Sequence, residues 1–224
     1  MATLRPTPSA TTGRDPATAW GTRVAPAWVV VADVVAKTLL FLAVARVAVE
    51  PGWGNLEGKA PGTRALTYPM LALVVPALQL VVGRARPYPW LADLLVTVPA
   101  FSDLLGNRLD LYDRVVWFDD AMHLASTAAL SAGVLVLAGA DAAPFRHRLQ
   151  LSVATGMTLS LAWELWEFYA FVTRSGEAPT AYADTLGDLA LGWVGAVLAA
   201  VLVGGPGRSR RRHEVTSAPG RGDL

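Results

Sequence analysis

LTYPMLALVVPALQLVV, the stretch from Leu66 to Val82, decides the fold class of this chain, because it contains no charged side chain. With its uncharged neighbours it approaches the ~20 apolar residues that a helix needs to cross the hydrocarbon core of a bilayer. Five more apolar blocks of similar length follow or precede it within the 224 residues. Helices and closed barrels alone satisfy backbone hydrogen bonds in lipid, and blocks this long are typical of helices. The sequence therefore predicts an all-α, polytopic transmembrane bundle.

We predict six spans in one membrane domain that covers residues 26–205, with limits near 26–48, 65–83, 89–106, 115–138, 149–173 and 183–204. The third span is the most polar, because it contains Asp93 and Asp103. Residues 1–25 and 206–224 are rich in Thr, Pro, Arg and small residues, a composition that cannot bury a core. They are predicted to be disordered tails.

The distribution of Lys and Arg outside the spans predicts the topology. An even number of spans puts both tails on one side, together with most of the arginines: Arg5, Arg14, Arg23, Arg84, Arg86, Arg146, Arg148 and the five of the C-terminal tail. The other side has only Lys59, Arg64, Arg108, Arg114 and Arg174. The positive-inside rule then predicts cytoplasmic tails in a multi-pass protein of a bacterial inner or plasma membrane. No nucleic-acid module is visible, and the absence of cysteine excludes disulfides and thiolate metal sites.

Three pairs of ionisable residues occur at helical spacing near the predicted outer ends of the last three spans. They are Asp119 and His123, Glu164 and Glu167, and Asp184 and Asp188. Residues three or four apart share one face of a helix, and ionisable residues within spans mark function by default. Gly187, Gly192 and Gly195 are expected to let the last helix approach its neighbours closely. We therefore predict that the three pairs form one shared site.

Five carboxylates around one imidazole cannot all remain ionised without cations or shared protons. Paired acids and a His on facing helices are the way in which helix bundles build carboxylate metal sites. The oxygen-rich ligand set suits Mg, Mn or Fe, with Zn also open. We expect His123, Glu164, Asp184 and Asp188 to bind the metal. Asp119 orients His123 or joins the ligands, and Glu167 acts as a general base.

These residues carry a family resemblance. Phe118-Asp119 with His123, Trp163-Glu164-Leu165-Trp166-Glu167-Phe168, and Asp184-Thr185 with Asp188 and Gly195-Ala196 resemble, in order and spacing, motifs of the YjdF-like inner-membrane proteins. The agreement covers residues 112–196. The layout is also distantly similar to that of VanZ-like proteins. The resemblance implies a polytopic membrane protein and supplies no activity.

Three functions remain open. The first is a metal-dependent enzyme acting on a lipid or isoprenoid-linked substrate at the outer leaflet. The second is a proton- or cation-coupled transporter that uses the same acids. The third is a non-catalytic membrane component in which the acids are helix caps and ion pairs, with Asp184 as an N-cap. Asp33 and Lys37, four residues apart in the first span, are interpreted as a neutralising pair within one helix.

Overall fold

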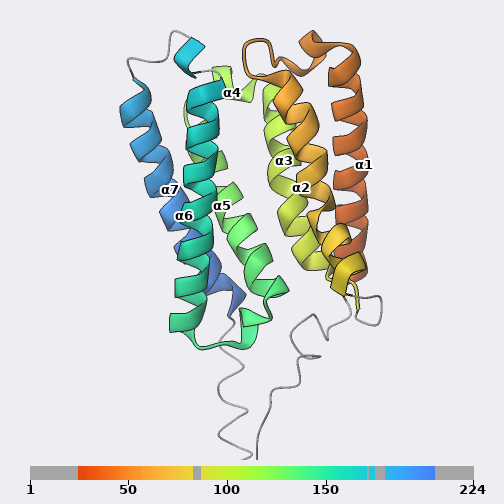
Figure 1. Cartoon of the computed structure of the whole chain (residues 1–224), viewed down its shortest axis with the longest axis vertical. Coiled ribbons are helices and arrows are strands. Elements are labelled where there is room, and N and C mark those ends of the chain that lie inside the picture. Colours follow the sequence, from red (N-terminus) through yellow and green to blue (C-terminus); the bar gives the residue numbers. More distant parts are fainter. Residues whose placement is uncertain (1–24, 83–86, 171, 175–179, 205–224) are drawn as a thin grey trace, which may run out of the picture.

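The computed structural model describes residues 25–82, 87–170, 172–174 and 180–204 (Figure 1). Within these ranges it consists of helices joined by short connections, with no strand. The α-helices are α1 (Ala27–Val49), α2 (Pro61–Val82), α3 (Trp90–Arg108), α4 (Leu111–Arg114), α5 (Phe118–Leu137), α6 (Phe145–Ala170) and α7 (Ala181–Val203). Three short 3-10 helices are η2 (Pro51–Gly54), η3 (Ala140–Ala142) and η4 (Val172–Arg174). The all-α prediction is confirmed.

The six long helices run up and down one bundle, and α4 lies across one end (Figure 1). Each of the six predicted spans corresponds to one of them, with limits that differ by a few residues. The first residue of α1 and the last of α7 lie at the same end of the bundle. The opposite end, which holds η2, α4 and η4, is called here the α4 end.

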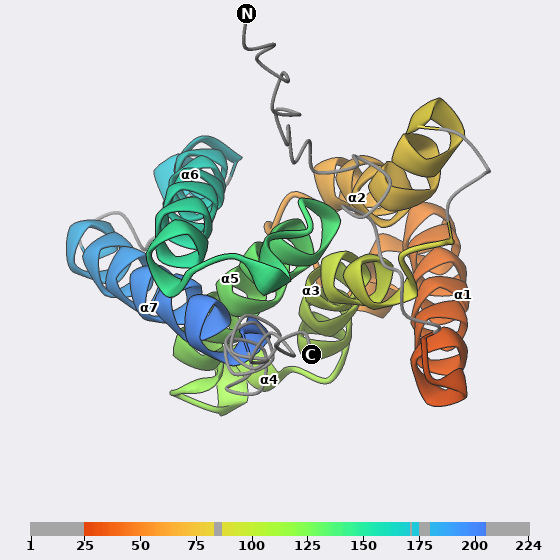
Figure 2. The same ribbon diagram turned by 90° about the horizontal axis from the view of Figure 1, so that it is seen from below.

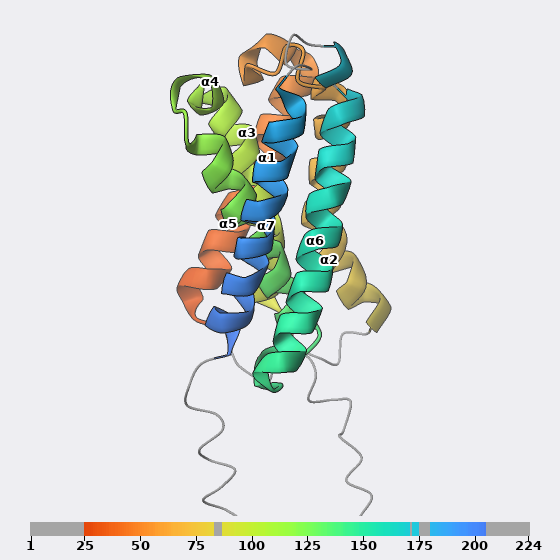
Figure 3. The same cartoon turned by 90° about the vertical axis from the view of Figure 1, so that its left-hand side faces the viewer.

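The bundle is built from two groups of three helices. Helices α1, α2 and α3 pack on one another, as do α5, α6 and α7, and α3 against α5 is the main contact between the two groups. Figure 2, which looks along the bundle, shows α3 and α5 adjacent in the middle. Figure 3 shows α6 and α7 running alongside each other on the outer side. The three predicted acid pairs all belong to the second group.

Large apolar side chains cover the outside of the bundle, and small ones fill much of its interior. Among the exposed residues are Leu42, Leu66, Met70, Leu80, Leu161, Leu165, Trp193, Val201 and Leu202. The buried set includes Ala72, Ala92, Ala100, Ala196, Ala199 and Ala200. Without a hydrophobic force between helices in lipid, small residues allow the close backbone packing that holds a membrane bundle together. This distribution fits a surface solvated by lipid.

Four of the described helices, α1, α2, α5 and α7, are long and apolar enough to cross a membrane. Helices α3 and α6 have sufficient length, but both carry more polar residues. Asp93, Thr97 and Asp103 of α3 are nevertheless buried, as are Ser160 and Glu164 of α6. Because these polar groups face other helices, lipid is not their solvent. That α3 and α6 also cross, giving six spans and cytoplasmic tails, remains a prediction.

Candidate metal centre

His123 lies at the centre of the predicted site. Its side chain projects from the second turn of α5 and is 9% exposed. On one edge of the ring, Nε2 is 3.5 Å from Oδ1 of Asp119 and 3.7 Å from Oδ1 of Asp188 on α7. On the other edge, Nδ1 is 3.6 Å from Oε1 of Glu164 on α6. The imidazole therefore lies between carboxyl groups from three helices.

These separations suit an intervening ion better than direct hydrogen bonds. A hydrogen bond between nitrogen and oxygen is ordinarily ~2.7–3.2 Å long. Two ligands of a tetrahedral metal, each ~2.1 Å from the ion, lie roughly 3.4 Å apart. Glu164 is 6% exposed, and among the described residues its Oε1 accepts no hydrogen bond. An unsatisfied carboxylate oxygen is costly in a buried position, so its chemistry fits that of a metal ligand.

The described residues contain two groups of three side chains whose ligand atoms lie within 4.8 Å of one another. One group is Asp119, His123 and Asp188, and the other is His123, Glu164 and Glu167. Five of the six predicted residues are thus brought together. Asp184 belongs to neither group; it lies one turn before Asp188 in the first turn of α7, and its side chain is exposed.

Close helix contacts below the site hold the pairs together. A Cβ added to Gly195 would lie 2.3 Å from the backbone oxygen of Leu124, so α5 and α7 meet with no space for a side chain. A Cβ on Gly192 would lie 2.3 Å from Oγ of Ser160 on α6. The Thr127 and Ser160 hydroxyls are hydrogen-bonded at 3.0 Å. The expected role of Gly187 is wrong, because a Cβ there would meet nothing within 4 Å.

Two contacts of the site could not be identified from sequence spacing alone. Thr185 on α7 lies beside the carboxyl group of Glu164. The guanidinium of Arg64 lies 5.7 Å from the ring centre of Trp163 and 5.1 Å from that of Trp166, on either side of Glu164 along α6. The sequence analysis counted Arg64 among the basic residues outside the spans, but it lies in α2 and is 4% exposed. The sequence signal for a buried Arg64 was its four-residue spacing from Tyr68. This spacing places the two side chains on one face of α2, where they are hydrogen-bonded.

Arg64 has partners within its own half of the molecule. It forms an ion pair with Asp103 of α3, and its Nε donates to the backbone oxygen of Lys59 at 2.9 Å. Tyr112 donates a hydrogen bond of 2.9 Å to Asp103. Arg64 is therefore a fixed cation that links the first three helices to the tryptophans beside the glutamates.

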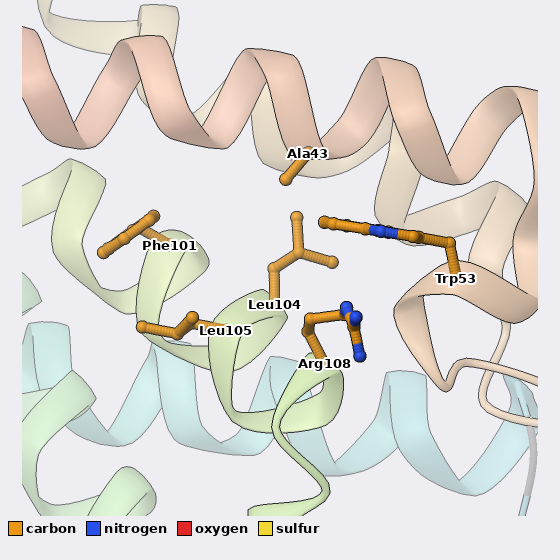
Figure 4. A pocket seen from close by; sticks show the side chains of 6 residues that line it. All are labelled: Ala43, Trp53, Phe101, Leu104, Leu105 and Arg108. Carbon is orange, nitrogen blue, oxygen red and sulfur yellow. The ribbon is translucent and has the colours of Figure 1, made fainter.

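A small pocket lies elsewhere, between α1, η2 and α3 (Figure 4). Its volume is about 30 Å³, room for roughly one water molecule. The guanidinium of Arg108 lies 5.0 Å from the ring centre of Trp53 at its edge. Its lining residues are Ala43, Trp53, Phe101, Leu104, Leu105 and Arg108, none of which belongs to the Asp/His/Glu cluster.

Comparison with known proteins identifies a family and no closer relative. The model of the family DUF2238, described as predicted membrane proteins, matches residues 35–206, which include α2 to α7, the part of α1 from residue 35 onward and all six site residues. Comparisons with curated proteins and with solved structures gave no match. The exposed apolar surface, the helical bundle and this match over most of its length lead to one conclusion: the chain belongs to the DUF2238 family of predicted membrane proteins.

Proposed function

We propose that the protein is a metal-dependent membrane enzyme that acts on a lipid or isoprenoid-linked substrate in the leaflet next to the α4 end. The observation that carries the proposal is Oε1 of Glu164, which is buried, accepts no hydrogen bond from the described residues and lies 3.6 Å from Nδ1 of His123. The oxygen-rich donors and one imidazole suit Mg, Mn, Fe or Zn.

The two ring nitrogens of His123 face different carboxyl groups, so the candidate ligands fall into two sets. One ring cannot present both nitrogens to a single ion, so Nδ1 with Glu164 and Glu167 forms one three-ligand set, and Nε2 with Asp119 and Asp188 forms the other. Three protein ligands are typical of catalytic sites, because they leave a position open for substrate. We place the ion on the Nδ1 edge, where the unsatisfied oxygen lies. Asp119 and Asp188 then face the N–H group of Nε2, and their negative charge favours this orientation of the ring.

The chemistry follows from the proposed ligands. A bound divalent ion lowers the pKa of water and polarises a phosphoryl or carbonyl oxygen. Glu167, on the same face of α6 as Glu164, would bind the ion through one carboxyl oxygen and accept the proton of an attacking water with the other. Asp184, exposed at the start of α7, can complete the ligand set once substrate is bound or attract a second cation.

The surroundings of the cluster support a lipid substrate. The side chain of Asp119 is 42% exposed, which gives the site an open polar side at the end of the bundle. Leu161, Leu165 and Leu186 on α6 and α7 are exposed next to it along the helices. A lipid could therefore place its polar head at the carboxyl groups while its chains lie against apolar helix surface.

Elemental analysis of the detergent-purified protein tests the metal. We expect wild type to contain nearly stoichiometric metal after reconstitution with Mn, Zn or Mg, and the variant Glu164→Gln/Asp188→Asn to lose it. Asp120→Asn is the matched control, because Asp120 is exposed on the same turn as Asp119 and belongs to neither ligand group. Hydrolysis or transfer measured on a panel of lipid and isoprenoid phosphates should then depend on the same two residues.

A metal-free wild type would contradict the proposal. Cation-dependent flux in sealed vesicles would then indicate a transporter that uses the acids as a relay. Loss of stability on substitution, without flux, would indicate a structural cluster. The similarity to YjdF-like and VanZ-like proteins is part of the proposal and supplies no activity of its own.

A further inference from the structure

A second cluster of ionisable side chains lies at the other end of the bundle. Nζ of Lys37 on α1 is 2.6 Å from Oδ1 of Asp33, 2.7 Å from Oδ1 of Asp93 on α3 and 2.8 Å from the hydroxyl of Thr97. Tyr88, just before α3, donates a hydrogen bond to the other carboxyl oxygen of Asp93. Asp33 and Asp93 are each 1% exposed. The intrahelical pair expected from sequence is thus part of a network between two helices.

The charges of this network do not balance. One ammonium group faces two carboxyl groups, so the fully ionised network has one excess negative charge within the bundle. The other cations of the described parts of α1, α2 and α3 have their own contacts at the α4 end: Arg46 with Glu50, Arg64 with Asp103, and Arg108 with the Trp53 ring. An uncompensated buried charge is strongly unfavourable, and protonation is the ordinary remedy.

The geometry indicates where the additional proton lies. Oδ1 of Asp33 and Oδ1 of Asp93 lie 2.6 Å and 2.7 Å from the same ammonium nitrogen, so the two buried carboxyl groups are held next to each other. Two ionised carboxylates this close together in a buried position repel each other, and a proton on one of them removes the repulsion. Oδ1 of Asp93 accepts no hydrogen bond from the described residues, although Nζ of Lys37 lies 2.7 Å away as an ion-pair partner.

We propose that Asp33 and Asp93 form a proton-binding site that holds one exchangeable proton between α1 and α3. Lys37 lies about equally close to both carboxyl groups, whereas Asp93 also accepts a hydrogen bond from Tyr88, which favours its ionised form, so Asp33 is the carboxyl group that holds the proton. Lys37 remains an ammonium ion and keeps the two carboxyl groups close together. The site is independent of the proposed metal centre, which lies at the α4 end on other helices.

Infrared spectroscopy of the full-length protein in detergent tests this proposal directly. The carbonyl stretch of a protonated carboxyl group is separate from carboxylate bands and shifts in D₂O. We expect a difference spectrum of wild type minus Asp33→Asn, recorded near neutral pH, to contain one such band. The Asn amide can accept from Lys37 and donate to Asp93, so this variant should fold. Asp93→Asn provides a second measurement of the same band.

Two further variants give opposite expectations. Lys37→Met removes the cation, so both carboxyl groups should become protonated and the band should grow. Asp113→Asn should leave the band unchanged, because Asp113 is exposed and pairs with Lys59 at the α4 end. An Asp33→Asn difference spectrum without the band would overturn the proposal. A band that disappears when NaCl is added at constant pH would also overturn it, by assigning the site to sodium.

Thermal stability provides an independent readout. An unfolded Asp releases its proton near pH ~3.9, so at neutral pH the folded protein would bind one proton more than the unfolded chain. Stability then falls as the pH rises toward the pKa of the folded site, because unfolding releases that proton. The melting temperature of wild type should decrease toward alkaline pH more steeply than that of Asp33→Asn. Parallel curves for the two proteins would contradict a bound proton.

Discussion

A single imidazole organises the candidate metal centre, since its two nitrogens face carboxyl groups from different helices. Nδ1 faces Glu164 of α6, while Nε2 faces Asp119 of α5 and Asp188 of α7. Four carboxyl groups gathered without a metal or protons would repel one another. The properties of the site therefore depend on one side chain more than on any single acid.

Replacing His123 should remove metal binding while the acids remain. We expect His123→Gln to reduce the metal content of the purified protein at least tenfold, because it removes the one nitrogen ligand and leaves four acids without a fixed arrangement. His147→Gln is the control, since His147 is exposed at the start of α6. Elemental analysis and titration with Mn measure both variants. Unchanged affinity in His123→Gln would place the metal elsewhere or exclude it.

Substitution of two aspartates near the α4 end by asparagine should lower the stability of the protein by very different amounts. Asp103 is buried and accepts hydrogen bonds from Arg64, Tyr68 and Tyr112. Asp103→Asn leaves a buried guanidinium without its counterion, which typically costs about 3–5 kcal/mol. Asp113→Asn removes only an exposed pair with Lys59, worth about 0.2–1 kcal/mol. Thermal melting in detergent should show a large decrease for the first and a small one for the second.

The small contribution of Asp113 has a defined pH dependence. The hydrogen bond from Lys59 lowers the pKa of Asp113 below its usual value. A carboxyl group with a lowered pKa in the folded state stabilises the protein above its unfolded pKa, and the stabilisation is lost as the pH falls through the folded pKa. Asp113→Asn should therefore lower the melting temperature slightly at neutral pH and not in acid. A larger difference in acid would contradict the pairing.

At the scale of single helices, α7 shows how residue size sets the distance between elements. Gly192 and Gly195 lie against α6 and α5 without space for a Cβ, whereas Gly187 borders open space. The hydroxyl of Ser152 donates to the backbone oxygen of Ala196 on α7 at 2.6 Å, and the hydroxyl of Ser160 is bonded to that of Thr127 between α6 and α5. The acidic side chains of α5, α6 and α7 can approach one another because the neighbouring turns of these helices pack closely.

Alanine at two positions of α7 should separate packing from helix propensity. Gly195→Ala places a methyl group against the carbonyl of Leu124, so α5 and α7 must move apart, and we expect lower stability together with weaker metal binding. Gly187→Ala meets nothing and should raise stability by up to about 1 kcal/mol through helix propensity. Melting curves and metal titrations of the two variants provide the comparison. Equal behaviour of the two would contradict the described contact.

The helices and most of the site could be predicted from sequence because the length of an apolar block and the spacing of two residues within it are local properties of the chain. Long apolar blocks located the six long helices, and pairs three or four residues apart located the acids that meet in the structure. Partners from distant helices were not predictable in this way. Arg64 beside Trp166, and Asp93 beside Lys37, depend on helix packing that no spacing within one segment contains. Gly187 was misjudged because a glycine alone does not indicate which face it occupies.

At the scale of the whole molecule, the two groups of three helices contribute different parts. The second group supplies all six predicted site residues, and the first supplies Arg64 and the carboxyl network around Lys37. Helix α3 joins them, since it packs on α1, α2 and α5. Any change in the relative position of the two groups must therefore involve the contact between α3 and α5, or that between Arg64 and the tryptophans of α6.

Cysteine labelling can test whether α3 crosses the membrane. The chain has no cysteine, so each introduced one is the only target for an impermeant thiol reagent. If all six long helices cross, Glu57→Cys and Asp113→Cys should react from one side and Ala142→Cys from the other; all three positions are exposed in connections or short helices. Labelling of Glu57→Cys and Asp113→Cys from opposite sides would show that α3 does not cross.

The ion pairs of α3 also bear on how the protein is made. Asp93 and Asp103 make this helix a poor candidate for entering lipid alone. Their counterions, Lys37 on α1 and Arg64 on α2, belong to segments that leave the ribosome earlier. During synthesis, Arg64 of the second helix therefore lacks its counterion until the third helix arrives, whereas Lys37 already has Asp33 within its own helix. We expect α1 to α3 to enter the bilayer as a unit, with the translocation machinery retaining the first two until their partner emerges.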